Sequence, residues 1–443
     1  MKQKFKVLSL GLMMTTCVMA QPVLAQQQDS VSFNLDKVLE VALSDNHEVR
    51  VANRTIEIQK YAKKETIAGL LPSISVTAAG THNLEVATIV TSMGAFKMGQ
   101  PYNYSLTGTV SVPLVAAQLW KSLEINQASV ELALEQARSS KISTISAVKK
   151  AFYQLILARD SYDVLRASYD LAEENLALTR NMYKYDQVAE YDTLTAYVQK
   201  VGIEPNLLSM QNTLKLAEMQ LKVLMGVDVN EPIRFEGHLK DYEQKLFSDL
   251  MVLKQDNDLE DNSSIRQINI QARQLRLSEK LNKLGYIPTL ALQIQGGWSS
   301  MPTEFNPFDA TYYGSASITL AFSWTLSGAS FMKTKQNKLS IENVEEQRQY
   351  ALEQLELAIN SSLNTIETAA EQVVANKQSV YASERAYQIS SKRYEVGSGT
   401  QLELNSSANS LQQTRLQYVQ AIYDFVSAQA TLEETLGRTV VSN

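Results

Sequence analysis

The chain contains the same ladder of apolar residues twice. In each copy six such residues recur at every seventh position, and the second copy follows the first at a constant offset of 211 residues. The two ladders are Val148, Leu155, Tyr162, Tyr169, Leu176 and Tyr183, and then Ile359, Ile366, Val373, Val380, Tyr387 and Tyr394. Each follows a strand-like stretch and ends at a short polar turn. This duplication predicts two similar units in one intertwined body, whose function lies in what the near-symmetric units enclose.

The ladders lie in two long predicted helices. Residues 117–185 and 329–396 contain no proline and keep helical spacing, so each helix should run about 100 Å at about 1.5 Å per residue. A strict seven-residue repeat makes helices supercoil left-handedly, and these rods should therefore pack as coiled coils. Shorter helices return over 190–225 and 401–436. In the first return, Pro205 is predicted to kink or break the helix because proline lacks a backbone donor.

Four segments alternate between apolar and polar residues with the two-residue period of a β-strand. None of them contains a charged side chain, and they lie at 73–78, 102–114, 290–295 and 315–326. A charge on the lipid-facing side of a barrel strand costs about 2 to 4 kcal/mol at the bilayer midplane, so uncharged strands fit a membrane wall. A sandwich with one buried face has the same composition. The loops 83–101 and 299–311 would face outside.

Prolines mark the entry into the first strand of each copy. Short helices are predicted at 53–70 and 264–285, and Pro72 and Pro288 follow them. The residue before a proline avoids the helical conformation, so these junctions should stop the helix and begin the strand.

Four strands are too few to close a membrane barrel. The smallest membrane barrels have about eight strands, and lipid cannot satisfy the open edges of a sheet. The wall must therefore be shared between copies of the chain, as a dimer or a trimer. The fold class predicted from the residues is mainly α with a membrane β part, internally duplicated, with long α-hairpins and four strands per protomer.

The first 25 residues read as a secretory signal. Three lysines precede an apolar run over 7–20, and Val23-Leu24-Ala25 resembles a cleavage site. The predicted organisation is a signal peptide (1–25), a first structural repeat (26–225), an equatorial linker (226–262) and a second structural repeat (263–443). The only cysteine, Cys17, lies within the signal. A mature chain would therefore have neither a disulfide nor a thiolate nucleophile.

Charge and motif content exclude several functions. Without the three signal lysines, 38 basic residues stand against 47 acids, and no Lys/Arg block occurs, so a nucleic-acid partner is not expected. The three histidines, His47, His82 and His238, are isolated and form no metal-binding spacing, so each is interpreted as a surface or loop residue. No nucleophile elbow or phosphate loop is present. We therefore expect no enzyme, cofactor or metal site.

The turns that end the two ladders complete a recognisable pattern. They read Tyr185-Asp186-Gln187-Val188-Ala189-Glu190-Tyr191-Asp192 and Tyr394-Glu395-Val396-Gly397-Ser398-Gly399-Thr400. Together with the two helix-to-strand prolines, this order resembles the TolC family of outer-membrane efflux ducts over essentially the whole mature chain. The resemblance implies a homotrimer with a twelve-stranded barrel in outer-membrane lipid and a twelve-helix tunnel across the periplasm. It also implies a periplasmic adaptor protein and an inner-membrane transporter as partners.

The tips hold the candidate site residues. Gly397 and Gly399 are predicted to supply the positive φ angles of a sharp reversal, and Asp186 can adopt the same conformation. Asp192 and Glu403 fall in the first turn of each returning helix, where an acid stabilises the helix dipole by about 0.3 to 1 kcal/mol. The threefold symmetry would also gather these two acids into a ring that selects cations and helps to keep the inner end closed.

The resemblance adds Tyr394 to this gate, together with acids at the positions of Asp192 and Glu403. This chain departs from the family's well-studied member, which has an arginine at Gly399 and a further acid at Ser406. Closure is therefore expected to depend on Tyr394 packing and on the two acids. The favoured function is a passive exit duct of an efflux or type I secretion system. The alternative is a secreted structural coiled-coil protein, such as an adhesin or a periplasmic scaffold.

Overall fold

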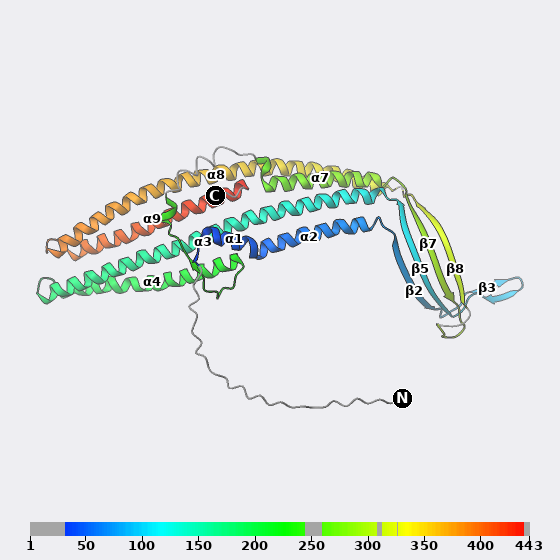
Figure 1. Ribbon diagram of the computed structural model, residues 1–443, viewed down its shortest axis with the longest axis horizontal. Helices are drawn as coiled ribbons and strands as arrows, with labels where there is room; N and C mark the ends of the chain where they lie inside the picture. The colour runs from blue at the N-terminus through cyan, green and yellow to red at the C-terminus, as the bar shows by residue number, and fades with distance from the viewer. Residues whose placement is uncertain (1–31, 244–258, 308–311, 326, 438–443) are drawn as a thin grey trace, which may run out of the picture.

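A computed structural model describes residues 32–243, 259–307, 312–325 and 327–437, and Figure 1 shows an elongated molecule with a curved sheet at one end. The predicted signal peptide, part of the linker and Leu326 lie outside the described residues. In the first repeat, the elements are α2 (His47–Ala68), β2 (Ser73–His82), β5 (Tyr102–Val115), α3 (Ala117–Lys184) and α4 (Glu190–Met225). In the second, they are α7 (Ser263–Leu284), β7 (Thr289–Ser300), β8 (Tyr312–Ser323), α8 (Gly328–Glu395) and α9 (Gln401–Leu436).

The long hairpins confirm the predicted duplication. Helices α3 and α8 each contain 68 residues, and α4 and α9 each contain 36. Both hairpins run side by side along the molecule, with their tips at the end opposite the sheet (Figure 1). None of the described helices is long and apolar enough to cross a lipid bilayer.

Shorter elements occupy the middle of the molecule and the far end of the sheet. They are β1 (Ser32–Phe33), α1 (Leu35–Asp45), β3 (Thr88–Thr91), β4 (Gly94–Lys97), β6 (Arg234–Phe235), α5 (Lys240–Glu243) and the 3₁₀-helix η1 (Leu259–Asp261). The pair β1 and β6 is parallel, so it ties the start of the described chain to the connector that follows α4. Strands β3 and β4 form a separate hairpin beyond the sheet (Figure 1).

The four long strands form one antiparallel sheet in the order β2-β5-β7-β8. The register sets apolar residues opposite one another on one face, where Ile74, Val110, Ile294 and Ile318 form a continuous row. The other face carries mainly Ser, Thr and Gln, because successive residues of a strand point to opposite sides. Strands β2 and β8 are the two edges of this sheet and have no further partner strand within the described chain.

The helix-to-strand prolines lie where the sequence predicted them. Helix α2 ends at Ala68, its last turn tightens through a bond from Leu71 N–H to the Ala68 carbonyl, and Pro72 directly precedes β2. In the second repeat, α7 ends at Leu284, and Pro288 directly precedes β7.

Pro205 was predicted to kink or break the first returning helix, and the prediction of a break is wrong. Helix α4 is continuous from Glu190 to Met225 with Pro205 inside it. A proline removes one backbone hydrogen bond, but neighbouring turns can hold a helix through its packing. Ile203 and Leu207 on either side of Pro205 are buried in a cluster with residues of α3, and this contact holds the helix across the gap.

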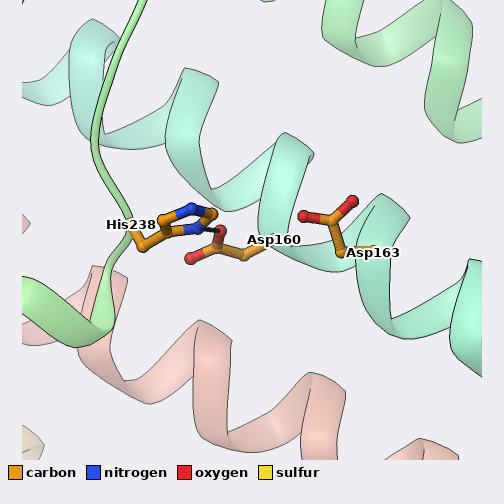
Figure 2. A group of neighbouring side chains, drawn as sticks. All are labelled: Asp160, Asp163 and His238. Carbon is orange, nitrogen blue, oxygen red and sulfur yellow. Dashed lines mark hydrogen bonds and ion pairs between the residues drawn. The ribbon is translucent and has the colours of Figure 1, made fainter.

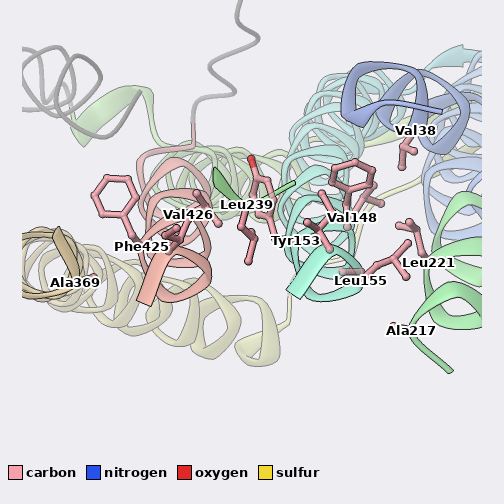
Figure 3. Close-up of a cluster of buried hydrophobic side chains, with 14 of the residues drawn as sticks. Val38, Val148, Tyr153, Leu155, Ala217, Leu221, Leu239, Ala369, Phe425 and Val426 are labelled. Carbon is pink, nitrogen blue, oxygen red and sulfur yellow. The ribbon is translucent and has the colours of Figure 1, made fainter. Parts of the chain in front are cut away.

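The main core lies at mid-length and joins both repeats (Figure 3). Val148 and Leu155 of the first ladder and Ile359 and Ile366 of the second belong to this cluster, which also takes residues from α1, α4 and α9. The returning helix α9 contributes its own seven-residue apolar row, of which Leu404, Leu411, Phe425 and Leu432 are buried. Both repeats therefore share one core rather than folding around separate cores.

Candidate functional site

Two reversals of the chain form the tips of the hairpins. At the first tip, Asp186 adopts a left-handed conformation with φ of 54°, and Gln187 N–H donates to the Met182 carbonyl at 3.0 Å. This is the conformation expected for Asp186, because a short polar side chain tolerates positive φ better than larger ones.

At the second tip, glycine has two different roles. Gly397 has φ of 73°, as expected, but the prediction of a positive φ at Gly399 is wrong. An added Cβ at Gly399 would lie 3.1 Å from the backbone nitrogen of Tyr394 and 3.1 Å from the Cβ of Arg393. Its N–H donates to the Arg393 carbonyl at 2.9 Å. Glycine at this position therefore relieves a tight approach between the returning chain and the end of α8, where a Cβ would require its neighbours to shift by a few tenths of an ångström.

The two predicted tip acids cap their own helices. The Asp192 carboxylate accepts the Ala189 N–H at 3.2 Å, and the Glu403 carboxylate accepts the Thr400 N–H at 3.3 Å. At the second tip, the Thr400 hydroxyl accepts the Glu403 N–H at 3.2 Å, which completes a reciprocal capping box. Both acids thus have a structural role as helix caps. Both side chains also keep enough exposure to act electrostatically.

Tyr394 is buried between the two hairpins, although it lies next to a tip. Only 3% of its surface is exposed, and its hydroxyl lies 3.2 Å from that of Thr179 on α3. Met182 and Leu404 pack in the same small cluster. Burial raises the pKa of Tyr394, the Thr179 hydrogen bond opposes this, and the nearby Asp192 carboxylate raises it further. The Asp192 carboxylate therefore acts on Tyr394 electrostatically.

Glu403 pairs with the residue that directly precedes Tyr394. Its carboxylate is 3.6 Å from the Arg393 guanidinium, which also donates to the Ser398 carbonyl at 3.1 Å. Both side chains of this ion pair are about half exposed, so the pair contributes little to stability. Arg393 and Thr179 were not among the predicted site residues. Arg393 could have been found as part of the basic pair Lys392-Arg393 before Tyr394, whereas Thr179 gave no signal.

The equivalent tyrosines of the two repeats have different environments. Tyr183 occupies the position of Tyr394 in the first ladder but is 43% exposed. One side of each hairpin faces the other repeat of the same chain, and the opposite side has no neighbour within the described chain. A residue that is buried in one copy and exposed in the other therefore marks a surface that a second chain can cover.

Polar contacts fasten the hairpins to one another above the tips. The Gln199 amide of α4 donates to Asn409 of α9 at 2.5 Å, and Asn175 of α3 donates to the Tyr387 hydroxyl of α8 at 3.5 Å. These bonds join neutral groups, so they hold the tips together without a buried charge.

All three histidines are exposed, as predicted for surface or loop residues, but His238 has acidic neighbours in space. Its Nδ1 lies 2.8 Å from a carboxylate oxygen of Asp160 on α3, and Asp163 lies beside this pair (Figure 2). His82 stacks on Tyr102 with ring centroids 4.4 Å apart, and His47 is the exposed first residue of α2. The contact of His238 spans 78 residues of sequence, and local spacing therefore could not reveal it.

The whole described hairpin architecture matches a known family. The family model described as "Outer membrane efflux protein" matches residues 38–227 and 256–438, which include both repeats. The chain belongs to the outer membrane efflux protein family. Among relatives within this family, "Outer membrane protein TolC" of Salmonella enteritidis is 21% identical over 417 residues, which cover 91% of this chain and 82% of the relative.

Solved channels share the fold at low sequence identity. The Campylobacter jejuni CmeC outer membrane channel superimposes with a TM-score of 0.71 at 14% identity, covering 91% of this chain and 85% of CmeC. The open state of the Neisseria gonorrhoeae MtrE outer membrane channel gives a TM-score of 0.69 at 16% identity, covering 91% of this chain and 89% of MtrE. The membership confirms the predicted family, the duplicated and mainly helical fold, and the outer-membrane location.

Proposed function

We propose that three copies of this chain form a passive exit duct that carries substrates across the periplasm and the outer membrane. The observation that carries the proposal is the uncharged four-stranded sheet, open at β2 and β8, continuous with two hairpins of 68- and 36-residue helices. A membrane sheet with two open edges needs partner strands from other chains. Three such sheets supply twelve strands, the number that the family resemblance implies.

The two faces of the sheet support this arrangement. The side chains of Ile74, Ile318 and Phe322 on the apolar face are 77%, 76% and 65% exposed in the single chain. Contact with lipid tails would remove this apolar surface from water. The Ser, Thr and Gln face would then line an uncharged, hydrated passage. Aromatic residues gather at the far end of the apolar face, where Tyr102, Tyr104 and Phe305 pack together, as expected at a membrane interface.

The tips would form the inner end of the passage. Three copies would bring six acids, from Asp192 and Glu403, to one ring, and such a ring favours cations electrostatically. The exposed sides of the hairpins would contact sister chains, with Tyr183 covering the junction between chains as Tyr394 covers the junction within one chain. Opening then requires the hairpins to separate at Tyr394 or at Tyr183. The open MtrE channel, which has the same fold, supports a tip that changes state.

The partners follow from the same assignment. The relatives include an "Antibiotic efflux pump outer membrane protein ArpC" of Pseudomonas putida and a "Toxin and drug export protein A" of Aggregatibacter actinomycetemcomitans. A duct of this kind receives its substrate from an inner-membrane transporter through a periplasmic adaptor. The duct carries out no chemistry itself, and the transporter supplies the energy.

The proposal is tested first on the purified wild-type protein. We expect it in the outer-membrane fraction, as a trimer in detergent that forms channels in planar bilayers. A water-soluble monomer without channel activity would instead support the periplasmic scaffold.

The gate is tested separately with Asp192→Ala and Glu403→Ala, singly and together. Loss of the acid ring should change the single-channel conductance and lower the preference for cations over anions. Glu190→Ala removes an exposed acid from the same turn of α4 and serves as the control. Unchanged conductance and selectivity in the double variant would refute the gate while leaving the duct intact.

A further inference from the structure

A cluster of metal-ligating side chains lies far from the tips, where the connector between the repeats crosses α3. After α4, the chain passes through β6 and reaches His238 just before α5. Leu239 is fully buried in the main core, and its N–H donates to the Asp160 carboxylate at 2.9 Å. The backbone N–H of His238 donates to the Asp241 carboxylate at 2.9 Å. The backbone at His238 is therefore held in place on both sides, and its side chain projects from a fixed point.

The side chains converge on one point (Figure 2). Asp160 and Asp163 are three residues apart on α3 and hence lie on the same face of the helix. His238 reaches this face from the connector, with Nδ1 at 2.8 Å from an Asp160 oxygen. One ligand atom from each of the three residues lies within 4.8 Å of the others. The donor set is thus one imidazole nitrogen and two carboxylate oxygens.

The charges at this point are incompletely balanced. Asp163 makes no hydrogen bond or ion pair with the described side chains, in contrast to Asp160. Burial raises the pKa of Asp163, the adjacent Asp160 raises it further, and His238 and Arg159 oppose the change. Two neighbouring carboxylates that repel each other and face a histidine form an environment that a divalent cation would neutralise.

We propose that Asp160, Asp163 and His238 bind a divalent transition-metal ion, with Zn²⁺ as the representative ion. An imidazole nitrogen suits zinc and its neighbours, whereas Mg²⁺ and Ca²⁺ prefer sites made of oxygen alone. Ligand atoms around a tetrahedral Zn²⁺ lie about 3.3 Å apart, from bond lengths of about 2.0 to 2.2 Å. The 2.8 Å from His238 Nδ1 to Asp160 is shorter than this value and the 4.8 Å limit on all three atoms is longer, so side-chain rotations would have to bring the ligand atoms to the required spacing. The His238 side chain is 60% exposed, so it can rotate and the ion can enter from solvent.

Binding would replace a contact between two side chains with bonds to a metal. The metal would take the place of the contact between His238 Nδ1 and the Asp160 carboxylate. Water would fill the remaining coordination positions, because three protein ligands leave the ion open. The ion would then bind both the connector and α3, and it would make the link between the two repeats more rigid. This inference does not depend on the proposed duct function.

The experiment uses the full chain in detergent, stripped with a chelator and titrated by calorimetry with Zn²⁺, Mg²⁺ and Ca²⁺. We expect one Zn²⁺ site per chain and no comparable Mg²⁺ or Ca²⁺ binding. Asp163→Asn and His238→Ala should each weaken Zn²⁺ binding by about tenfold or more. Asp163→Asn is the cleaner variant, because it leaves both Asp160 hydrogen bonds in place.

Matched controls are available on the same chain. Asp170→Asn removes an exposed acid two turns further along α3, and His47→Ala removes an exposed histidine. Both should bind Zn²⁺ like the wild type. Equal Zn²⁺ affinity in the wild type, Asp163→Asn and His238→Ala would overturn the proposal, as would Mg²⁺ binding as tight as that of Zn²⁺. Zn²⁺ should also slow hydrogen exchange over residues 236–243 in the wild type but not in Asp163→Asn.

Discussion

Lys149 on α3 and Glu433 on α9 form an ion pair of 2.5 Å that is nearly inaccessible to solvent and joins the two repeats. Removing one partner of a buried pair leaves an uncompensated charge, which costs about 3 to 5 kcal/mol. We expect Lys149→Met to lower the thermal unfolding midpoint of the detergent-solubilised protein strongly, as measured by circular dichroism. The double variant Lys149→Met/Glu433→Met should recover most of the loss, because no unpaired charge then remains.

The neighbouring pair supplies the control for this prediction. Lys150 lies 3.3 Å from Glu434, but both side chains are about one third exposed. An exposed pair contributes about 0 to 1 kcal/mol, so Lys150→Met should change the midpoint little. If Lys149→Met were no more harmful than Lys150→Met, the buried pair would not be a structural link between the repeats.

The contact between Tyr394 and Thr179 predicts a selective effect on channel opening. Tyr394→Phe and Thr179→Val each remove one hydroxyl of this buried contact, at a cost of about 1 kcal/mol for a neutral hydrogen bond. Weaker adhesion between the hairpins should increase the open fraction in planar bilayers, with only a small loss of stability. Tyr183→Phe changes the exposed equivalent in the first repeat and should leave the contact within the chain intact. Equal open fractions in wild type and Tyr394→Phe would contradict the prediction.

Two glycines of α4 predict opposite effects of the same substitution. Gly226 has φ of 76°, and an added Cβ would lie 2.3 Å from the Asp45 carbonyl oxygen of α1. Gly226→Ala should destabilise the protein by more than about 2 kcal/mol, since backbone strain and a backbone clash add together. Gly202 lies inside the helix with nothing within 4 Å of an added Cβ. Gly202→Ala should instead stabilise by about 0.5 to 1 kcal/mol, through helix propensity. Thermal unfolding of both variants shows whether each substitution raises or lowers the stability.

The sequence predicted the regular elements of this fold well, because their signals are local and repeated. The ladder from Val148 to Tyr183 and its copy fixed the two long helices within one residue of α3 and α8. Pro205 misled the analysis, because a local rule about one lost hydrogen bond ignored the packing of Ile203 and Leu207 on α3.

The tip and the connector were predicted less completely, for a physical reason. The tight fit around Gly399 comes from the close approach of two segments, which depends on three-dimensional geometry and has no sequence pattern. The partners of Tyr394 and His238 are distant in sequence, at Thr179 and Asp160. Periodicity identifies which face of a helix is buried, but it does not identify which residue from another helix will meet it.

Partly buried tyrosines near the connector predict a loss of stability at alkaline pH. Burial raises the pKa of Tyr242 from its usual value of about 10 to about 12, and the Asp241 and Asp36 carboxylates add to the shift. Below about pH 10 the tyrosine is protonated in both states, so the stability is unaffected. Between about pH 10 and 12, only the unfolded state loses the proton, so the folded state becomes progressively less favoured. Burial also raises the pKa of Tyr418, which donates a hydrogen bond to Glu243 at 2.8 Å.

Tyr242→Phe therefore removes part of the alkaline destabilisation. Relative to the wild type, the variant should gain about 1 kcal/mol between pH 8 and pH 11, after discounting for the partial exposure of the ring. Chemical denaturation at the two pH values measures this difference. Tyr61→Phe, at an exposed position of α2, is the matched control and should follow the wild-type pH dependence. If the free energy of unfolding fell equally with pH in Tyr242→Phe and in the wild type, other groups would cause the loss of stability at alkaline pH. Removing the phenol with the raised pKa must remove its contribution.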